Sequence, residues 1–150
     1  MLRDRSLIPL SHQHHNGLAM CVLTRRSLRE DSSPANVAQL ARRAIDRYEL
    51  ELANHFEIEE KILFPVIENA LGKLALVAGL ITQHREIEDL IAQLRGAPTA
   101  ILVERLCDLL TEHIRREEHD LFEMAQARLP EDILRELGIA IEARVVRICL

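Results

Sequence analysis

The sequence has few residues of the kinds that break helices or cross-link chains. Its 150 residues include five glycines, five prolines and three cysteines, and tryptophan is absent. With 48% apolar and 29% charged residues, this composition suits a soluble helical protein with its own core. Cys21, Cys107 and Cys149 are an odd number, lie far apart and include no Cys-x-x-Cys pair. We therefore expect reduced thiols in a cytoplasmic protein, with Cys149 exposed and the others packed in the core.

Charge and hydropathy exclude two classes of partner. The formal net charge is −5 and the sequence pI is about 5.8, so the chain has no basic footprint for nucleic acid or for an anionic membrane. No run approaches the roughly 18 apolar residues of a membrane span. The N-terminus is not typical of a signal peptide, because Arg3, Asp4 and Arg5 are charged and Pro9 interrupts the apolar run that follows them.

Apolar residues recur every three or four positions along the chain, and no strand pattern is present. The expected helices span about residues 11–29, 34–69, 73–95, 100–129 and 131–148. Four long helices joined by short loops predict an all-α fold: an antiparallel up-down-up-down four-helix bundle over about residues 9–129, within a single domain of residues 1–150. We expect the short C-terminal helix to pack outside the bundle or to form a self-association surface, which would make the protein a homodimer.

Cap residues and prolines set the expected helix boundaries. Ser11 and Thr99 are expected N-caps, and Ser33 followed by Pro34 is a stronger start signal. Pro65 lies inside the second expected helix. It removes a backbone hydrogen bond there and should bend that helix.

One apolar stripe contains two polar residues near its centre. Its members, each three or four residues from the last, are Val37, Ala41, Ala44, Tyr48, Leu52, His55, Glu59, Ile62 and Val66. A buried carboxylate without a partner costs several kcal/mol, so His55 and Glu59 need a compensating group. A bound metal ion would compensate both.

The chain repeats this arrangement further on. The second stripe consists of Leu102, Leu106, Leu110, His113, Glu117, Leu121 and Met124. His113 aligns with His55, and Glu117 aligns with Glu59, without a gap. One His-x-x-x-Glu on a helix is a weak signal, since buried His–Glu pairs also occur in ordinary cores. Two copies in matching register indicate a metal site.

The other two long helices each add a histidine. His15 lies three residues before Leu18, and His84 lies three before Ile87, so each half of the chain pairs one such helix with a His-x-x-x-Glu helix. His14 is the alternative to His15. A pseudo-twofold arrangement would gather four imidazoles and two carboxylates. These ligands suit iron, manganese or zinc, and the carboxylates could bridge two ions about 3.5–4 Å apart.

These residues resemble a known family. The motifs are His15-Asn-Gly-Leu18, His55-Phe-x-x-Glu59-Glu60-x-x-Leu-Phe-Pro65, His84-Arg-Glu-Ile87 and His113-x-x-x-Glu117-Glu118-x-x-Leu-Phe122. Over roughly residues 9–129 they resemble hemerythrin-like (HHE) domains. The resemblance implies a four-helix bundle with a non-haem diiron centre of the Fe–O–Fe type that binds O₂ or a similar small molecule end-on at one iron. By ligand chemistry, manganese or zinc stays possible. The resemblance also implies terminal ligands at His15, His55, His84 and His113, and bridging carboxylates at Glu59 and Glu117.

Two positions depart from hemerythrins proper. Those proteins have a second histidine one turn after the helix-three histidine, where this chain has Glu88. Glu88 lies on the same helix face as His84 and is either a third carboxylate ligand, which would disfavour reversible O₂ carriage, or a solvated helix charge. The helix-four carboxylate of hemerythrins would select Glu118, whereas the internal repeat and the apolar stripe favour Glu117. Glu60 and Glu118 would otherwise support the ligands or face solvent.

The expected function is that of a metal- and gas-binding module. The first hypothesis is binding, sensing or detoxifying O₂, NO or peroxide, or handling iron, without turnover. The second is a diiron enzyme with peroxidase, catalase-like or NO-reducing activity. Repair of iron–sulfur clusters ranks lower, because the relatives known for it carry an additional cysteine-bearing N-terminal segment. The Glu-x-x-His repeats of ferritin-like oxidases and the His-Glu-x-x-His motif of zincins are absent.

Overall fold

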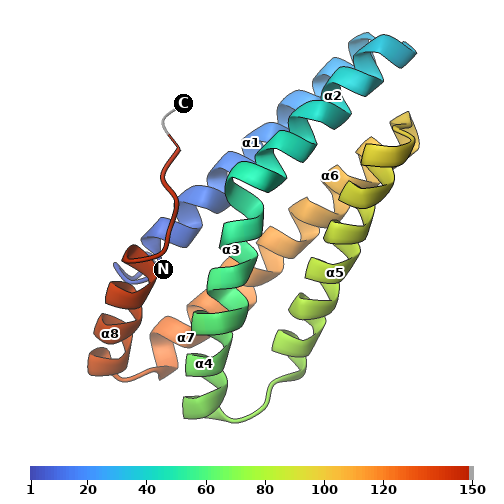
Figure 1. Cartoon of the computed structure of the whole chain (residues 1–150). Coiled ribbons are helices and arrows are strands. Elements are labelled where there is room, and N and C mark those ends of the chain that lie inside the picture. The colour runs from blue at the N-terminus through green and yellow to red at the C-terminus, as the bar shows by residue number, and fades with distance from the viewer. Residues whose placement is uncertain (149–150) are drawn as a thin grey trace.

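The computed structural model describes residues 1–148, and this range consists of helices and turns with no strand (Figure 1). The expectation of an all-α chain is confirmed. None of the helices in this range is both long and apolar enough to cross a membrane. Cys149, which we expected to be exposed, lies outside the described residues.

Four helical rods and one short helix follow one another along residues 1–148. The first rod is α1 (Ile8–Glu30) and the third is α5 (Ala75–Gly96). The second runs without a break through α2 (Pro34–Arg47), η1 (Tyr48–Leu52), α3 (Ala53–Ile58), η2 (Glu59–Leu63) and α4 (Phe64–Leu71). The fourth joins α6 (Ala100–Arg116), η3 (Glu117–Leu121) and α7 (Phe122–Arg128), and α8 (Glu131–Glu142) follows it.

Side-chain caps explain two of the helix starts. Ser33 caps α2 and Thr99 caps α6 as expected, each accepting a hydrogen bond from the backbone N–H three residues later. The expected cap at Ser11 is wrong, because α1 already begins at Ile8. Pro9 falls in the first turn of α1, where its missing N–H is not needed.

Three π turns, η1, η2 and η3, are inserted into the second and fourth rods. In η2 the backbone N–H of Phe64 bonds to the carbonyl of Glu59, five residues back. This turn holds one residue more than an α turn, so the buried face advances by one position. Leu63 is therefore fully buried, where the α-helical spacing predicted Ile62. In the fourth rod, η3 begins at Glu117 in the same way.

The second rod bends at a different place from the one expected. Pro65 lies in the first turn of α4, directly after η2, where proline is tolerated. Figure 1 shows the rod changing direction between α2 and α3, at η1.

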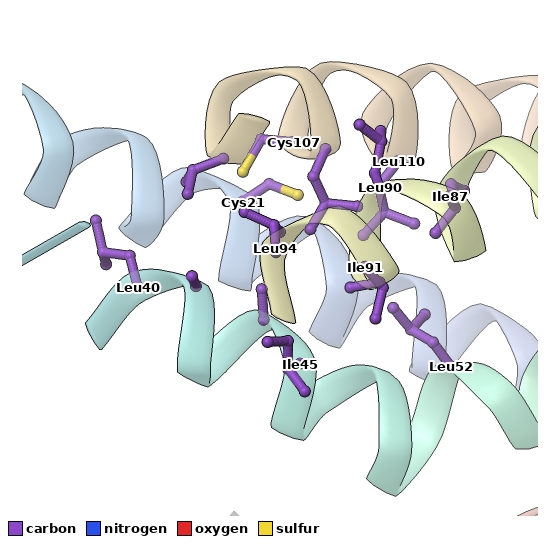
Figure 2. Packing of buried hydrophobic residues seen from close by; sticks show 14 of the residues in the cluster. Cys21, Leu40, Ile45, Leu52, Ile87, Leu90, Ile91, Leu94, Cys107 and Leu110 are labelled. Carbon is purple, nitrogen blue, oxygen red and sulfur yellow. The ribbon is translucent and has the colours of Figure 1, made fainter. Parts of the chain in front are cut away.

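Two apolar cores lie one beyond the other along the rods. The α2 core includes Cys21, Leu40, Ile45, Leu52, Ile87, Leu90, Ile91, Leu94, Cys107 and Leu110 (Figure 2). The α8 core includes Leu7, Leu10, Ile58, Leu63, Phe64, Leu80, Leu121, Phe122, Leu137 and Ile141. The first and third rods run from the α8 core to the α2 core, and the second and fourth run the opposite way. The segment between the two cores carries the histidines and glutamates of both repeats.

The C-terminal helix differs from its expected form. Leu134, Leu137 and Ile141 of α8 are buried in the α8 core, so α8 packs against the bundle and its apolar face is covered by the chain itself. Of the two expected roles, packing beside the bundle fits this arrangement, and a self-association surface gains no support. A Cβ at Gly138 would lie 3.0 Å from the Cα of Ser6, so the absence of a side chain there lets α8 approach the N-terminal segment closely. The helix ends at Glu142 and not near residue 148, and a tail of residues 143–148 follows (Figure 1).

Candidate metal centre

Six histidine and glutamate side chains meet between the two cores. They are His14, His55, Glu59, His84, His113 and Glu117, and none is more than 3% exposed. They come from α1, α3, η2, α5, α6 and η3. Glu59 and Glu117 are the first residues of η2 and η3, so both π turns begin at a carboxylate of the cluster. π turns of this kind are frequent at functional sites.

The first half of the cluster is the His14/His55 group. His14 Nε2 lies 2.8 Å from Glu117 Oε2 and 3.8 Å from Glu59 Oε1. His55 Nε2 lies 2.8 Å from Glu59 Oε1 and 4.0 Å from Glu117 Oε2. Two imidazole nitrogens and two carboxylate oxygens therefore converge on one point.

The second half is the His84/His113 group, which uses the other oxygen of each carboxylate. His84 Nε2 lies 3.1 Å from Glu59 Oε2 and 3.9 Å from Glu117 Oε1. His113 Nε2 lies 3.2 Å from Glu117 Oε1. In each half, the four ligand atoms lie within 4.8 Å of one another.

Several of these atoms lack a hydrogen bond of acceptable geometry, although they are buried. They are Glu59 Oε1, Glu117 Oε1 and His113 Nε2. Glu59 Oε1 has His55 Nε2 at 2.8 Å but accepts no well-directed hydrogen bond from it. Buried polar atoms without partners are rare and costly in folded proteins. A cation between the converging atoms would satisfy them, so the residues present fit a metal, and the buried imidazoles and carboxylates indicate a metal cation.

All four imidazoles point Nε2 inward and donate from Nδ1 to an outer partner. His14 Nδ1 donates to Glu118 Oε1 at 2.6 Å, and His84 Nδ1 donates to Glu60 Oε2 at 3.0 Å. The remaining two donate to amides: His55 Nδ1 to Gln13 Oε1 at 2.7 Å, and His113 Nδ1 to Gln83 Oε1 at 3.0 Å. Such partners fix the ring orientation and the tautomer in which Nε2 is free to bind a metal.

The outer partners obey the same pseudo-twofold relation as the cluster. Each glutamine directly precedes a histidine of its own helix and accepts from a histidine of the neighbouring rod. Each outer glutamate directly follows a cluster glutamate. Ten side chains are therefore arranged as two equivalent sets of five.

Burial and charge give the two cluster carboxyls opposite pKa shifts. Burial, together with the negative charge of Glu117, raises the pKa of Glu59 well above its usual value. Burial alone would also raise the pKa of Glu117, but the charge of His113 and the hydrogen bond from His14 lower it well below normal. Burial lowers the pKa of His84 to about 3, so this imidazole stays neutral. Perturbed groups of this kind are typical of functional sites.

His15 does not face the cluster. Its side chain is exposed, and the structure places the alternative, His14, in the buried position. The buried seam of α1 continues from His14 through Gly17, Cys21 and Thr24. Residues that are small or polar therefore form this seam, whereas the expectation for His15 rested on the larger Leu18.

Glu88 and Glu118 also lie outside the cluster. Arg85 donates to Glu88 Oε1 at 2.6 Å and holds that carboxylate at the surface, so Glu88 is a solvated helix charge and not the third carboxylate considered above. Glu117 is the cluster residue of the fourth rod, and Glu118 is an outer partner of His14. His55, Glu59, His84 and His113 lie together as expected.

Gln13 and Gln83 are the site residues that the sequence reasoning missed. Glutamine is common on solvated helix faces, so neither residue stands out by itself. The signal was the Gln-His dipeptide, which occurs at Gln13-His14 and again at Gln83-His84. When the first and second halves of the chain are aligned on this dipeptide, His14 matches the ligand candidate His84, and Gln13 matches Gln83.

The fold and the site define an all-α metal-binding domain with a buried histidine and glutamate cluster. Residues 7–125 match the family model of the hemerythrin HHE cation-binding domain, and the chain belongs to this family. Comparisons with curated proteins and with solved structures give no significant match.

Proposed function

We propose that the chain is a cytoplasmic non-haem diiron protein that binds a small ligand such as O₂, NO or peroxide in order to sense or detoxify it. The alternation of the rods between the two cores supports an up-down-up-down bundle around this centre. The family supplies the cation-binding character. The number of ions, their identity and the ligand are the parts that we propose.

One observation carries the proposal of two ions. Glu59 and Glu117 each direct one oxygen to the His14/His55 group and the other to the His84/His113 group. A single ion would need only one oxygen from each carboxylate, and the second oxygen of each would stay buried without a partner. Two ions bridged by both carboxylates use all four oxygens.

Iron is the metal that we propose for this ligand set. Each half offers two imidazoles and two carboxylate oxygens, which suit iron, manganese or zinc. Bound iron would supply redox electrons and coordination positions open to a small ligand, because four protein atoms do not complete an octahedral shell. The chain's own residues orient the imidazoles through Nδ1 and exclude water with the two apolar cores.

A binding or sensing module is favoured over an enzyme. The enzyme hypothesis drew support from a carboxylate-rich ligand set that included Glu88. Because Glu88 pairs with Arg85 at the surface, the cluster keeps only its two carboxylates.

The test begins with metal content and ends with the visible spectrum. Protein purified without a metal-binding tag should contain about two iron ions per chain. The anaerobic ferrous protein is then mixed separately with O₂, NO and H₂O₂. A lasting visible band with one of them, lost when that ligand is removed, supports binding. Repeated consumption of H₂O₂ or NO without such a band would show turnover and overturn the module in favour of the enzyme. A well-folded protein that takes up no iron would overturn the proposal entirely.

A further inference from the structure

The two halves of the cluster share the same ligands and outer partners but differ in what holds those partners. Two terminal segments, the chain ends, fold over the outer layer of the His14/His55 group: the N-terminal residues and the tail of residues 143–148. Within residues 1–148, neither of them bonds the outer partners of the His84/His113 group. This difference breaks the pseudo-twofold relation outside the ten side chains described above.

The C-terminal tail holds the amide of Gln13. Asn54 donates from Nδ2 to the carbonyl of Arg144 at 3.0 Å and accepts from the N–H of Val146 at 3.0 Å. The carbonyl of Val146 then accepts from Gln13 Nε2 at 3.1 Å, while Gln13 Oε1 accepts from His55 Nδ1. Gln13 also lines a pocket of about 250 Å³ between α1, η1 and the tail. The tail therefore fixes the amide that separates His55 from this pocket.

The N-terminal segment holds the carboxylate of Glu118. Arg3 donates to Glu118 Oε2 at 2.7 Å and to the Glu118 carbonyl at 2.9 Å, and Gln126 Oε1 accepts from the same guanidinium at 3.1 Å. Ser11 Oγ donates to Glu118 Oε1 at 2.7 Å. Glu118 is thus fixed on both oxygens before it accepts from His14.

The other half has a looser outer layer. Glu60, the partner of His84, is bonded by Arg85, whose side chain is 54% exposed and shared with Glu88. Exposed ion pairs of this kind hold a side chain weakly. Within residues 1–148, the amide nitrogen of Gln83 makes no hydrogen bond that would correspond to the bond between Gln13 and Val146.

We propose that the two metal positions are unequal: the chain ends clamp the His14/His55 position, which keeps its ion after the His84/His113 position has released its own. This inference rests on the two-ion centre proposed above. A metal's outer partners commonly change its affinity by about 10–100-fold when they are lost, so a difference in how they are held should appear as a difference in affinity.

Zinc tests the inference without redox chemistry. Metal-free protein is titrated with Zn²⁺ against a chromophoric chelator, which gives the two stepwise dissociation constants. They should differ by about tenfold or more. His55→Ala should remove the tighter step and His113→Ala the weaker one, which assigns each step to its half.

Variants that release one chain end at a time then show which zinc-binding step depends on it; we call the contacts of Asn54 with the tail and of Arg3 with Glu118 the clamps. Asn54→Ala and Arg3→Ala should each weaken the tighter step by about tenfold and leave the weaker step unchanged. Arg85→Ala is the matched control on the other half and should affect only the weaker step. In Asn54→Ala, amide hydrogen exchange at Val146 should also become faster, which shows that the tail has been released. Should Asn54→Ala fold poorly, Val146→Pro removes the same N–H from an exposed position of the tail.

The outcomes distinguish this inference from the proposed function. Two zinc ions bound with equal affinity would overturn the inequality but not the two-ion centre. So would clamp variants that weaken both steps alike or neither of them. Binding of fewer than two zinc ions by the wild-type chain would overturn the proposed centre itself, and the inequality with it.

Discussion

The Nε2 atoms of His14 and His55 lie 2.9 Å apart, and both rings already donate from Nδ1. Two such nitrogens can approach this closely only if one of them carries a proton. His14 Nε2 also lies 2.8 Å from Glu117 Oε2, whereas His55 makes no well-directed hydrogen bond to Glu59 Oε1. We therefore assign this proton, and the positive charge it brings, to His14 in the metal-free protein. Metal binding must displace this proton.

The metal-free protein should lose stability as the pH rises above about 6.5. Burial lowers the pKa of His14, but hydrogen bonds to Glu117 and Glu118 outweigh it and raise this pKa above the ordinary value of 6.5. The raised pKa of Glu59 acts in the same direction, and its effect begins at the ordinary value of about 4.5. The folded state therefore retains protons that the unfolded state has lost, and each one costs up to about 1.4 kcal/mol of unfolding free energy per pH unit.

His84 makes the stability of the metal-free protein fall at low pH instead. Its pKa is lowered to about 3, so the stability that its neutral ring contributes is present above pH 6.5 and lost as the pH falls below it. Below pH 6.5 this gain opposes the loss caused by Glu59, whereas above pH 6.5 only the losses from His14 and Glu59 remain, so urea denaturation of the metal-free protein between pH 5 and pH 9 should show a clear fall in stability above pH 6.5. Zinc-loaded protein is the control and should keep gaining stability toward pH 8. A metal-free protein whose stability climbs steadily to pH 8 would contradict the protonation assigned to His14.

Loss of a shared carboxylate should be more damaging than loss of one imidazole. Glu59→Gln leaves one amide oxygen where two carboxylate oxygens serve both groups, so both positions should fail and the iron content should fall from about two ions per chain toward zero. His55→Ala affects only one group and should leave about one ion. Elemental analysis together with circular dichroism measures both effects. Equal loss of iron in the two variants would argue against shared carboxylates.

His14 and His15 offer a direct comparison of neighbouring residues. His14→Ala should lower the iron content by about half, because it removes a buried ligand atom of the His14/His55 group. His15→Ala should leave the iron content unchanged, since that side chain is exposed. The same elemental analysis would reverse our assignment if His15→Ala were the variant that loses metal.

The sequence predicted the helical class and the caps at Ser33 and Thr99 because these depend on local chemistry. Ser33 and Thr99 act through hydrogen bonds to backbone three residues away, and a linear reading captures that range. Glu88 lies outside the cluster because Arg85 binds its carboxylate, and the spacing of residues along the helix does not reveal that ion pair. That residues 1–150 form a single domain stays a prediction.

The face of α1 was the main error at the site, and its cause is physical. Apolar size is the usual guide to a buried face, yet Val22 is 56% exposed and Leu23 is 60% exposed. Gly17 is buried instead, and a Cβ there would lie 3.2 Å from Ile114 Cδ1. Close approach of α1 and α6 selects small residues along the seam, and a hydrophobicity pattern does not detect that requirement.

The π turn η2 should be necessary for the centre but not for the fold. Deletion of the exposed Lys61 would return η2 to α-helical spacing. Either the buried side chains Leu63 and Phe64 or the carboxylates on the other side of the deletion must then rotate. Burial of each large apolar side chain contributes about 1.5–3 kcal/mol, and a hydrogen bond to a charged group contributes a similar amount. Rotation of Leu63 and Phe64 would displace the whole buried face of α4, so we expect the carboxylates to rotate out of the cluster instead.

The Lys61 deletion variant should therefore show helical circular dichroism and cooperative melting but hold fewer than about one iron ion per chain. Lys61→Ala keeps the residue count and is the matched control, with about two ions expected. Deletion of Asp120, an exposed residue of η3, should reproduce the loss on the pseudo-equivalent rod. If the deletion variants retained both ions, the π turns would not be what directs Glu59 and Glu117 into the cluster, and their position at the first residue of each turn would need another physical cause.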